Sequence, residues 1–160
     1  MRRVLAGATT VSPGELERYL HEHIPLSRAM AVSVVAVASD HVLLKAPLAP
    51  NINHRETVFG GSAAALAMLA AWSLLHIRLR QQGIGARLVI QRNTMEYARP
   101  IGGEFTARSA LEQPERWPQF TATLARRGKA RVAVAAVLEE AGAVAGRLTG
   151  EFVALRGADA

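Results

Sequence analysis

Residues 60–82 read GGSAAALAMLAAWSLLHIRLRQQ and predict one long helix that is buried on most of its surface. The stretch Ala63–Leu75 carries no charge and is apolar on every side, unlike a helix that lies on a protein surface. Gly83 then supplies a typical C-terminal stop. The 13 uncharged residues are too few to span a bilayer, so we expect no membrane partner. In a small domain, a curved sheet is the element that covers so much of one helix.

The rest of the chain supplies the strands for such a sheet. Ser12 begins a capping box that opens a helix over 13–24, and the spacing of Trp117, Phe120 and Leu124 predicts a short helix late in the chain. Alternating or β-branched segments predict strands near 30–38, 41–47, 87–97, 104–111, 130–140 and 144–155. Short glycine turns separate several neighbours, which favours antiparallel pairing. The pattern predicts a single α+β domain over 1–160, with its core at about 13–156.

The composition excludes several classes of function. With 160 residues, of which 50% are hydrophobic and none is cysteine, the chain needs no disulfides and has no thiolate zinc site or cysteine nucleophile. Its five histidines show no ligand spacing with carboxylates, so we expect no metal and no cofactor. The net charge of +6 permits a phosphate-bearing partner without identifying one.

The N-terminal segment Met1–Val11 resembles a secretory signal only faintly. Its apolar part is short, contains Gly7, Thr9 and Thr10, and runs directly into the first helix. We therefore expect a cytoplasmic protein.

A polar loop leads into the long helix, and Pro50–Ser62 reads PNINHRETVFGGS. Backbone N–H groups at a helix N-terminus have no intrahelical partner and carry the positive end of the helix dipole. Gly60 and Gly61 have no side chains, so a carbonyl oxygen can approach those amides closely. Thr57 and Ser62 are expected to act as N-cap residues of the helix as well.

This organisation resembles the hotdog fold, in which a curved antiparallel sheet wraps around one long central helix. Many hotdog thioesterases carry the motif N-x-x-G-x-x-H-G-G at the start of that helix, and Asn53–Gly61 agrees with it at Asn53, Gly60 and Gly61. A closer resemblance is to the putative-thioesterase group that also forms the C-terminal domain of some bacterial acetyltransferase-like proteins. Its pattern P-N-x-N-x-x-x-T-x-F-x-G-S fits Pro50–Ser62, and Trp72 and the segment Tyr97–Pro100 also look like this group.

The resemblance implies a thioesterase that hydrolyses an acyl thioester of coenzyme A or of acyl carrier protein. It implies that Gly60 or Gly61 holds the carbonyl and that Asn53 orients the attacking water, since an amide is too weak a base to deprotonate it. Coenzyme A would be part of the substrate. The resemblance also implies a homodimer or tetramer with the acyl tunnel between protomers. Together with Glu56 as a possible base, the expected catalytic residues are Asn53, Gly60, Gly61 and Glu56, and the expected substrate-binding residues are Asn51, Thr57, Phe59, Ser62 and Arg99.

The sequence departs from the family pattern where a base is expected. Glu56 replaces a motif glycine, Phe59 replaces the motif histidine, and no carboxylate lies between Glu56 and Glu96. The base is then Glu56, alone or paired with His54, or Glu96, or an acid from a second protomer. Phe59 argues against the hydratases of the same fold. The missing helix carboxylate keeps an alternative open, a non-catalytic module that binds an acyl thioester or an acyl carrier.

The densest basic cluster is Arg126–Arg131, near the end of the expected short helix. Such a cluster could meet substrate phosphates, but it is more typical of a solvated helix end. Nucleic-acid binding uses basic patches together with exposed aromatic side chains, and here the aromatic residues fall at core-like spacing. We therefore expect no nucleic-acid partner.

Overall fold

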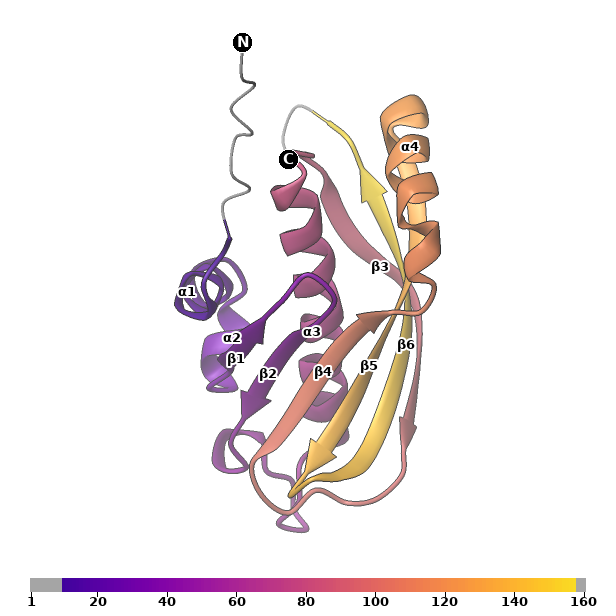
Figure 1. Ribbon diagram of the computed structural model, residues 1–160. Coiled ribbons are helices and arrows are strands. Elements are labelled where there is room, and N and C mark those ends of the chain that lie inside the picture. Colours follow the sequence, from indigo (N-terminus) through magenta and orange to yellow (C-terminus); the bar gives the residue numbers. More distant parts are fainter. Residues whose placement is uncertain (1–9, 158–160) are drawn as a thin grey trace.

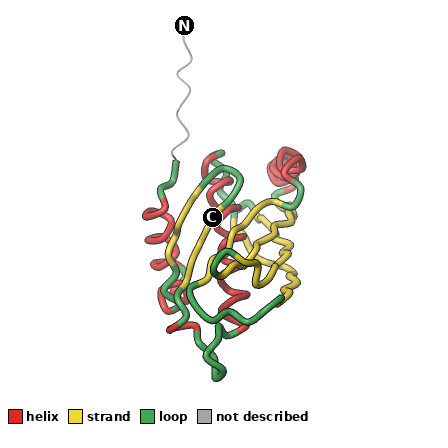
Figure 2. Tube along the Cα trace, turned by 60° about the horizontal axis from the view of Figure 1, so that its bottom comes forward, coloured by secondary structure: helices red, strands yellow, loops and turns green. Residues whose placement is uncertain are grey.

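The computed structural model describes residues 10–157, and its centre is the helix α3 (Gly60–Gln81). A six-stranded sheet curves around this helix (Figure 1), and the curvature is clear in the turned view of Figure 2. Most of the N-terminal segment that we compared with a secretory signal, residues 1–9, lies outside the described residues. The α+β architecture with one central helix confirms the fold predicted from the sequence.

Every neighbouring pair of strands in the sheet is antiparallel. The spatial order is β1-β2-β4-β5-β6-β3, so the first strand after α3 lies at one edge. The strands are β1 (Ser33–Val37), β2 (Val42–Ala46), β3 (Arg87–Tyr97), β4 (Phe105–Leu111), β5 (Lys129–Glu140) and β6 (Ala143–Leu155). Because β3 pairs only with β6, the backbone groups along its outer side have no strand partner within the described chain.

The helix α3 forms the core because small side chains alternate with leucines around it. Ala67, Ala70, Leu74 and Leu75 are fully buried, and the sheet strands pack on this side. The helix is long and apolar enough to match a membrane-spanning segment, but 56% of its apolar window is buried inside the domain, as in a core helix. The opposite side of α3 is less covered, and this asymmetry positions the hollows described below.

The first helix, α1 (Pro13–His23), begins with the expected capping box. The Ser12 hydroxyl accepts a hydrogen bond from the Glu15 amide, and the Glu15 carboxylate accepts one from the Ser12 amide. The helix packs on the core through the buried Leu16 and Leu20. Its polar side chains add two bonds, since Glu17 accepts from the Val34 amide of β1 at 2.9 Å and a His21 ring nitrogen bonds the Val32 carbonyl just before β1 at 2.8 Å.

Two boundaries differ from the prediction. Pro25 does not simply end α1, because it opens a second short helix, α2 (Pro25–Ala29), and β1 starts at Ser33 rather than near residue 30. A proline is compatible with the first turn of a helix as well as with the end of one. The predicted short helix is present as α4 (Trp117–Arg127), preceded by the 3-10 turn Pro114–Arg116.

Candidate active site

The loop before α3 is anchored by Asn51, at the end of the 3-10 turn Ala49–Asn51. The Asn51 side chain is buried, and its amide nitrogen donates to the carbonyls of Met30 (3.0 Å) and Pro47 (2.8 Å). Its backbone carbonyl accepts from the Phe59 amide at 2.8 Å. These contacts tie both ends of the loop to the body of the domain, so Asn51 shapes the loop and does not reach its outer surface.

Asn53 organises the turn at the tip of the loop. Its Oδ1 accepts from the amides of Arg55 (2.8 Å) and Thr57 (3.2 Å), and its Nδ2 donates to the Thr57 hydroxyl (2.9 Å) and to the Val58 carbonyl (3.4 Å). An asparagine side chain has two acceptor sites and two donor hydrogens, so all four are in use. To orient a water molecule, Asn53 must give up one of these bonds, and the longest is the one to Val58.

Glu56 occupies the outermost part of the same turn. Its backbone has φ +62°, a left-handed conformation that costs energy for a residue with a side chain, and the side chain is exposed. His54 is exposed as well, and among the described residues no hydrogen bond or ion pair joins it to Glu56. Glu56 is therefore a solvated carboxylate presented by the loop.

The N-terminus of α3 is open in the way that anion or carbonyl binding requires. Phe59 is the N-cap residue and makes no side-chain cap, so our expectation that Thr57 and Ser62 act as caps is wrong. The Thr57 hydroxyl is engaged by Asn53 instead, and Ser62 lies inside the first turn. The amides of Gly60, Gly61 and Ser62 belong to the first turn and have no intrahelical acceptor, whereas the Ala63 amide already bonds the Phe59 carbonyl at 3.1 Å.

Two exposed aromatic side chains border these amides. Tyr97, at the end of β3, is 57% exposed and donates its hydroxyl to the Gly60 carbonyl at 3.0 Å. Phe59 is 59% exposed, and its ring lies so close to Gly61 that a Cβ atom there would overlap it. Gly61 is thus needed for this packing, whereas a Cβ at Gly60 would only make an ordinary contact with Tyr97 at 3.5 Å. The sequence indicated Tyr97 only through the resemblance of Tyr97–Pro100 to the thioesterase group.

Arg99 lies at the same end of the domain but is already engaged. Its guanidinium donates to the carbonyls of Glu140 (2.9 Å) and Ala143 (3.3 Å), which flank the β5–β6 turn. Glu96, the other possible base in this region, is exposed and lies opposite Arg147 of β6.

An apolar groove starts one turn after Gly61 and runs along the half-buried side of α3, between α2 and the strands β3 and β6. Its volume is about 230 Å³. Helix α2, helix α3 and the strands β3 and β6 contribute its walls, which are formed by Ile24, Leu26, Ser27, Met30, Ala65, Met68, Leu69, Trp72, Ile90 and Phe152. Because almost all of these side chains are apolar, the groove suits an alkyl chain.

The basic cluster Arg126–Arg131 does not belong to this region. Figure 1 shows α4, which carries Arg126 and Arg127, at the upper end of the molecule, whereas α3 begins at the lower end. Residues 10–157 contain no group of three or more potential metal-ligating side chains.

Comparison with known protein families gives a match to the family described as "Putative thioesterase (yiiD_Cterm)" over residues 14–156. The chain belongs to this thioesterase family. The match spans the whole hotdog domain and includes the loop, the amides of α3 and the apolar groove.

Solved structures support the fold of this thioesterase family member. A protein of unknown function from Chlorobaculum tepidum is 25% identical with a TM-score of 0.84, and the alignment covers 92% of this chain and 99% of that one. A thioesterase-like protein from Shewanella oneidensis is 23% identical with a TM-score of 0.77, over 90% and 97% of the two chains. A thioesterase from Haemophilus influenzae is 13% identical with a TM-score of 0.75, over 93% and 94%. These similarities confirm the hotdog fold.

Proposed function

We propose that this protein hydrolyses an acyl thioester of coenzyme A or of acyl carrier protein at the N-terminus of α3. The observation that carries the proposal is the set of free amides at Gly60, Gly61 and Ser62, bordered by exposed aromatic rings and followed by an apolar groove. Such amides stabilise the negative charge that develops on a carbonyl oxygen under attack. The groove then receives the acyl chain.

In the reaction, a water oxygen attacks the thioester carbonyl carbon, the carbon–sulfur bond breaks, and the thiolate leaves and takes up a proton. Asn53 orients the water by exchanging its long bond to Val58 for one to the water oxygen. Glu56, three residues further along the same turn, accepts the proton of the water and returns it to the leaving thiolate. We propose the cytoplasm as the place of this reaction.

We further propose that two copies of the chain complete the site. The edge strand β3 offers its outer backbone groups for pairing, and Val89 on this strand is 46% exposed. The apolar groove beside β3 is also open on one side. A second copy that pairs through β3 would cover the outer edge of this strand and the open side of the groove. The assembly would be a homodimer or a tetramer built from two such dimers.

A second candidate function is a module that binds an acyl thioester or acyl carrier without cleaving it. It is favoured by the absence of any carboxylate on α3 and by the complete engagement of Asn53 within its own turn.

A thiol-release assay over acyl-coenzyme A substrates of increasing chain length tests the proposal. We expect turnover that falls about 100-fold in Glu56→Gln and in Asn53→Ala, as for loss of a general base or a positioning group. Glu115→Gln, which neutralises an exposed carboxylate outside the site, is the matched control and should leave turnover unchanged.

Saturable binding of acyl-coenzyme A without thiol release would support the binding module. Turnover that neither substitution changes would show that Asn53 and Glu56 have no part in the reaction. Size-exclusion chromatography with light scattering tests the shared site, and a mass of one chain would contradict it.

A further inference from the structure

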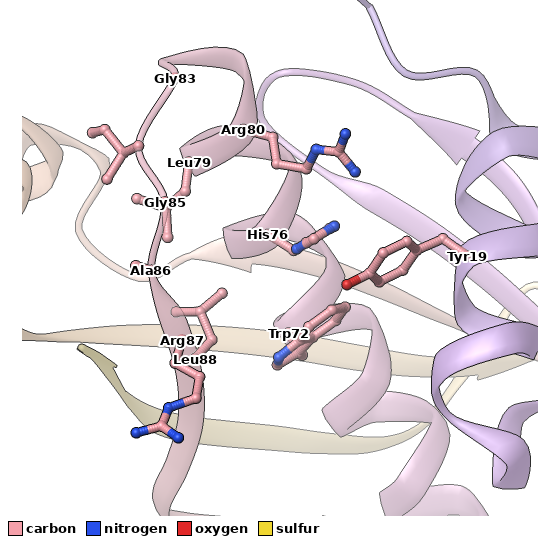
Figure 3. A pocket seen from close by; sticks show the side chains of 11 residues that line it. Tyr19, Trp72, His76, Leu79, Arg80, Gly83, Gly85, Ala86, Arg87 and Leu88 are labelled. Carbon is pink, nitrogen blue, oxygen red and sulfur yellow. The ribbon is translucent and has the colours of Figure 1, made fainter. Parts of the chain in front are cut away.

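A second, larger hollow lies at the other end of α3. It has a volume of about 570 Å³, within the range of sites that hold small molecules. The helices α1 and α3, the segment after α3 and the start of β3 form its walls, with Tyr19, Trp72, His76, Leu79, Arg80, Gly83, Ile84, Gly85, Ala86, Arg87 and Leu88 as lining residues (Figure 3). We call it the α3 C-terminal pocket. With 1.5 Å per helical residue, His76 lies ~24 Å along the helix from Gly60.

Aromatic rings from two helices form one side of this pocket. The His76 ring lies 4.7 Å from the rings of Tyr19 and Trp72, centre to centre, and the planes are within 29° of parallel. Tyr19 also stacks on His23 at 4.1 Å. Since all these rings share one stacking direction, a further flat ring can be added to them with favourable offset-stacked geometry.

Four polar side chains around the rings offer hydrogen-bond donors to a ligand. Arg80 and Arg87 are exposed, come from α3 and β3, and border the pocket in Figure 3. Within the described residues, neither guanidinium forms an ion pair or a side-chain hydrogen bond, and the Trp72 indole N–H and the Tyr19 hydroxyl have no hydrogen-bond partner either. No acidic side chain lines the pocket.

The ligand that such a lining recognises is an anion. The two arginines leave a positive potential, which Glu15 of α1, whose pKa the charge of Arg80 helps to lower, offsets in part at Arg80. Their planar guanidinium groups bind phosphate in a bidentate way. An acyl chain suits the apolar groove better than this pocket, because the groove shares Trp72 with it but contains no charged residue.

We propose that the α3 C-terminal pocket binds a small molecule in which a flat aromatic ring carries phosphate, that is, a phosphorylated nucleoside. The ring stacks on the cluster of Tyr19, His76 and Trp72, and the phosphate bonds Arg80 and Arg87. This site lies away from the amides that hold the thioester carbonyl, and nucleotide binding measured by calorimetry does not rest on thioester hydrolysis.

The electrostatics of His76 agree with this assignment. Burial, with smaller contributions from the charges of Arg80 and His23, lowers the pKa of His76 from 6.5 to about 4. The ring is therefore neutral at pH 7 and stacks without adding a charge of its own. Tyr19 on α1 is the other titratable group that stacks on this ring.

Isothermal titration calorimetry of the full chain with adenosine 3′,5′-bisphosphate tests the proposal. We expect saturable binding, and weaker binding by at least tenfold for adenosine alone and for inorganic phosphate alone, because each supplies only half of the contacts. Arg80→Gln and Arg87→Gln should each weaken binding about tenfold, the loss expected for one charge-assisted hydrogen-bonded pair. Arg126→Gln, which removes the same charge from the exposed end of α4, is the matched control and should bind normally.

Fluorescence gives a local readout, because Trp72 and Trp117 are the chain's only tryptophans. In a Trp117→Phe variant, the bisphosphate should quench the emission of Trp72, and His76→Ala should weaken both quenching and calorimetric binding. Absence of binding in the parent chain would overturn the proposal. The proposal would also be overturned if inorganic phosphate bound as tightly as the bisphosphate. Equal losses of bisphosphate affinity in Arg126→Gln and Arg80→Gln would overturn it as well.

Steady-state kinetics distinguish two possible ligands, the nucleotide end of coenzyme A and a free nucleotide. If the nucleotide end of coenzyme A occupies the pocket, Arg80→Gln raises KM for acyl-coenzyme A about tenfold and leaves KM for an acyl-N-acetylcysteamine thioester unchanged. If a free nucleotide is the ligand, neither KM changes while the calorimetric loss persists. Both results support the pocket as a nucleotide site, and they are independent of whether Glu56 or Asn53 takes part in hydrolysis.

Discussion

The two ends of α3 belong to the same helix but present different chemical groups. At its N-terminus, glycine leaves backbone amides uncovered, and the neighbouring groove is almost wholly apolar. At its C-terminus, Trp72, His76 and Arg80 recur every four residues and present rings and a positive charge. Under the two proposals, one helix serves two ligand chemistries because its buried face is shared and its ends are not.

A substitution in the buried middle of α3 should have the largest effect on stability, and it should impair the sites at both ends of the helix. Leu74 is fully buried, and Leu74→Ala should lower the free energy of unfolding by about 3 kcal/mol through lost burial and a residual cavity. Urea denaturation followed by circular dichroism measures this. Thioesterase activity and nucleotide binding should decline together as the protein unfolds, and a loss at one end alone would contradict a common core.

A substitution at the N-terminus of α3 should impair thioester hydrolysis and leave nucleotide binding at the other end intact. Gly61→Val would press its side chain into the Phe59 ring and cover the free amides, so we expect kcat/KM for acyl-coenzyme A to fall about 100-fold. Binding of adenosine 3′,5′-bisphosphate should remain within twofold of the parent. Steady-state kinetics and calorimetry on the same preparation test this, and a parallel loss of nucleotide binding would show that the ends are coupled.

Acid should lower the stability of the folded protein through His76, at the C-terminal end of α3. The pKa of His76 is about 4 in the folded protein and near 6.5 when unfolded, so the unfolded state binds the extra proton first as the pH falls. This contribution to the free energy of unfolding is complete above pH 6.5 and is lost between pH 6.5 and 4. Because the ring is partly exposed, we expect the loss to be about 2 kcal/mol.

Thermal unfolding at pH 7 and pH 4.5 compares the parent with His76→Phe, which keeps a ring in the stack. The variant should lose less stability on acidification, and NMR titration of the histidine rings should give His76 the low pKa. Equal acid sensitivity of the two proteins would exclude His76 as the cause.

The smallest loss of stability is expected from a substitution at Gly83, just after the C-terminus of α3. Gly83 has φ +66° and closes α3 with two characteristic bonds, from its own amide to the Arg80 carbonyl (3.0 Å) and from the Ile84 amide to the Leu79 carbonyl (2.9 Å). Gly83→Ala should cost about 1 kcal/mol of stability. It should weaken nucleotide binding slightly, because this segment is a pocket wall, and leave thioester hydrolysis unchanged in the same kinetic assay.

Much of the fold follows from local sequence patterns. The bounds of α3 and β3 were predicted to within one residue, since an apolar run closed by Gly83 and an alternating strand are strong local signals. The short helix α2 was missed because a proline both ends and begins helices. The order of the strands depends on contacts between distant segments, which a single sequence does not display.

The two hollows differ in how far the sequence could reveal them. The N-terminal loop lies within 13 consecutive residues, so its motif was visible, although the bonds that engage Asn53 and Arg99 were not. The C-terminal pocket joins Tyr19, His76 and Arg87 from three elements, and no spacing in the chain relates them. The repeat of Trp72, His76 and Arg80 at helical spacing was the only local signal.

The left-handed backbone at Glu56 has a consequence for the evolution of the loop. At φ +62° a glycine would be unstrained, whereas a residue with a side chain costs about 1 kcal/mol or more. Glu56→Gly should therefore yield a more stable protein that hydrolyses thioesters more slowly. Selection for stability and selection for turnover would then favour different residues at this one position.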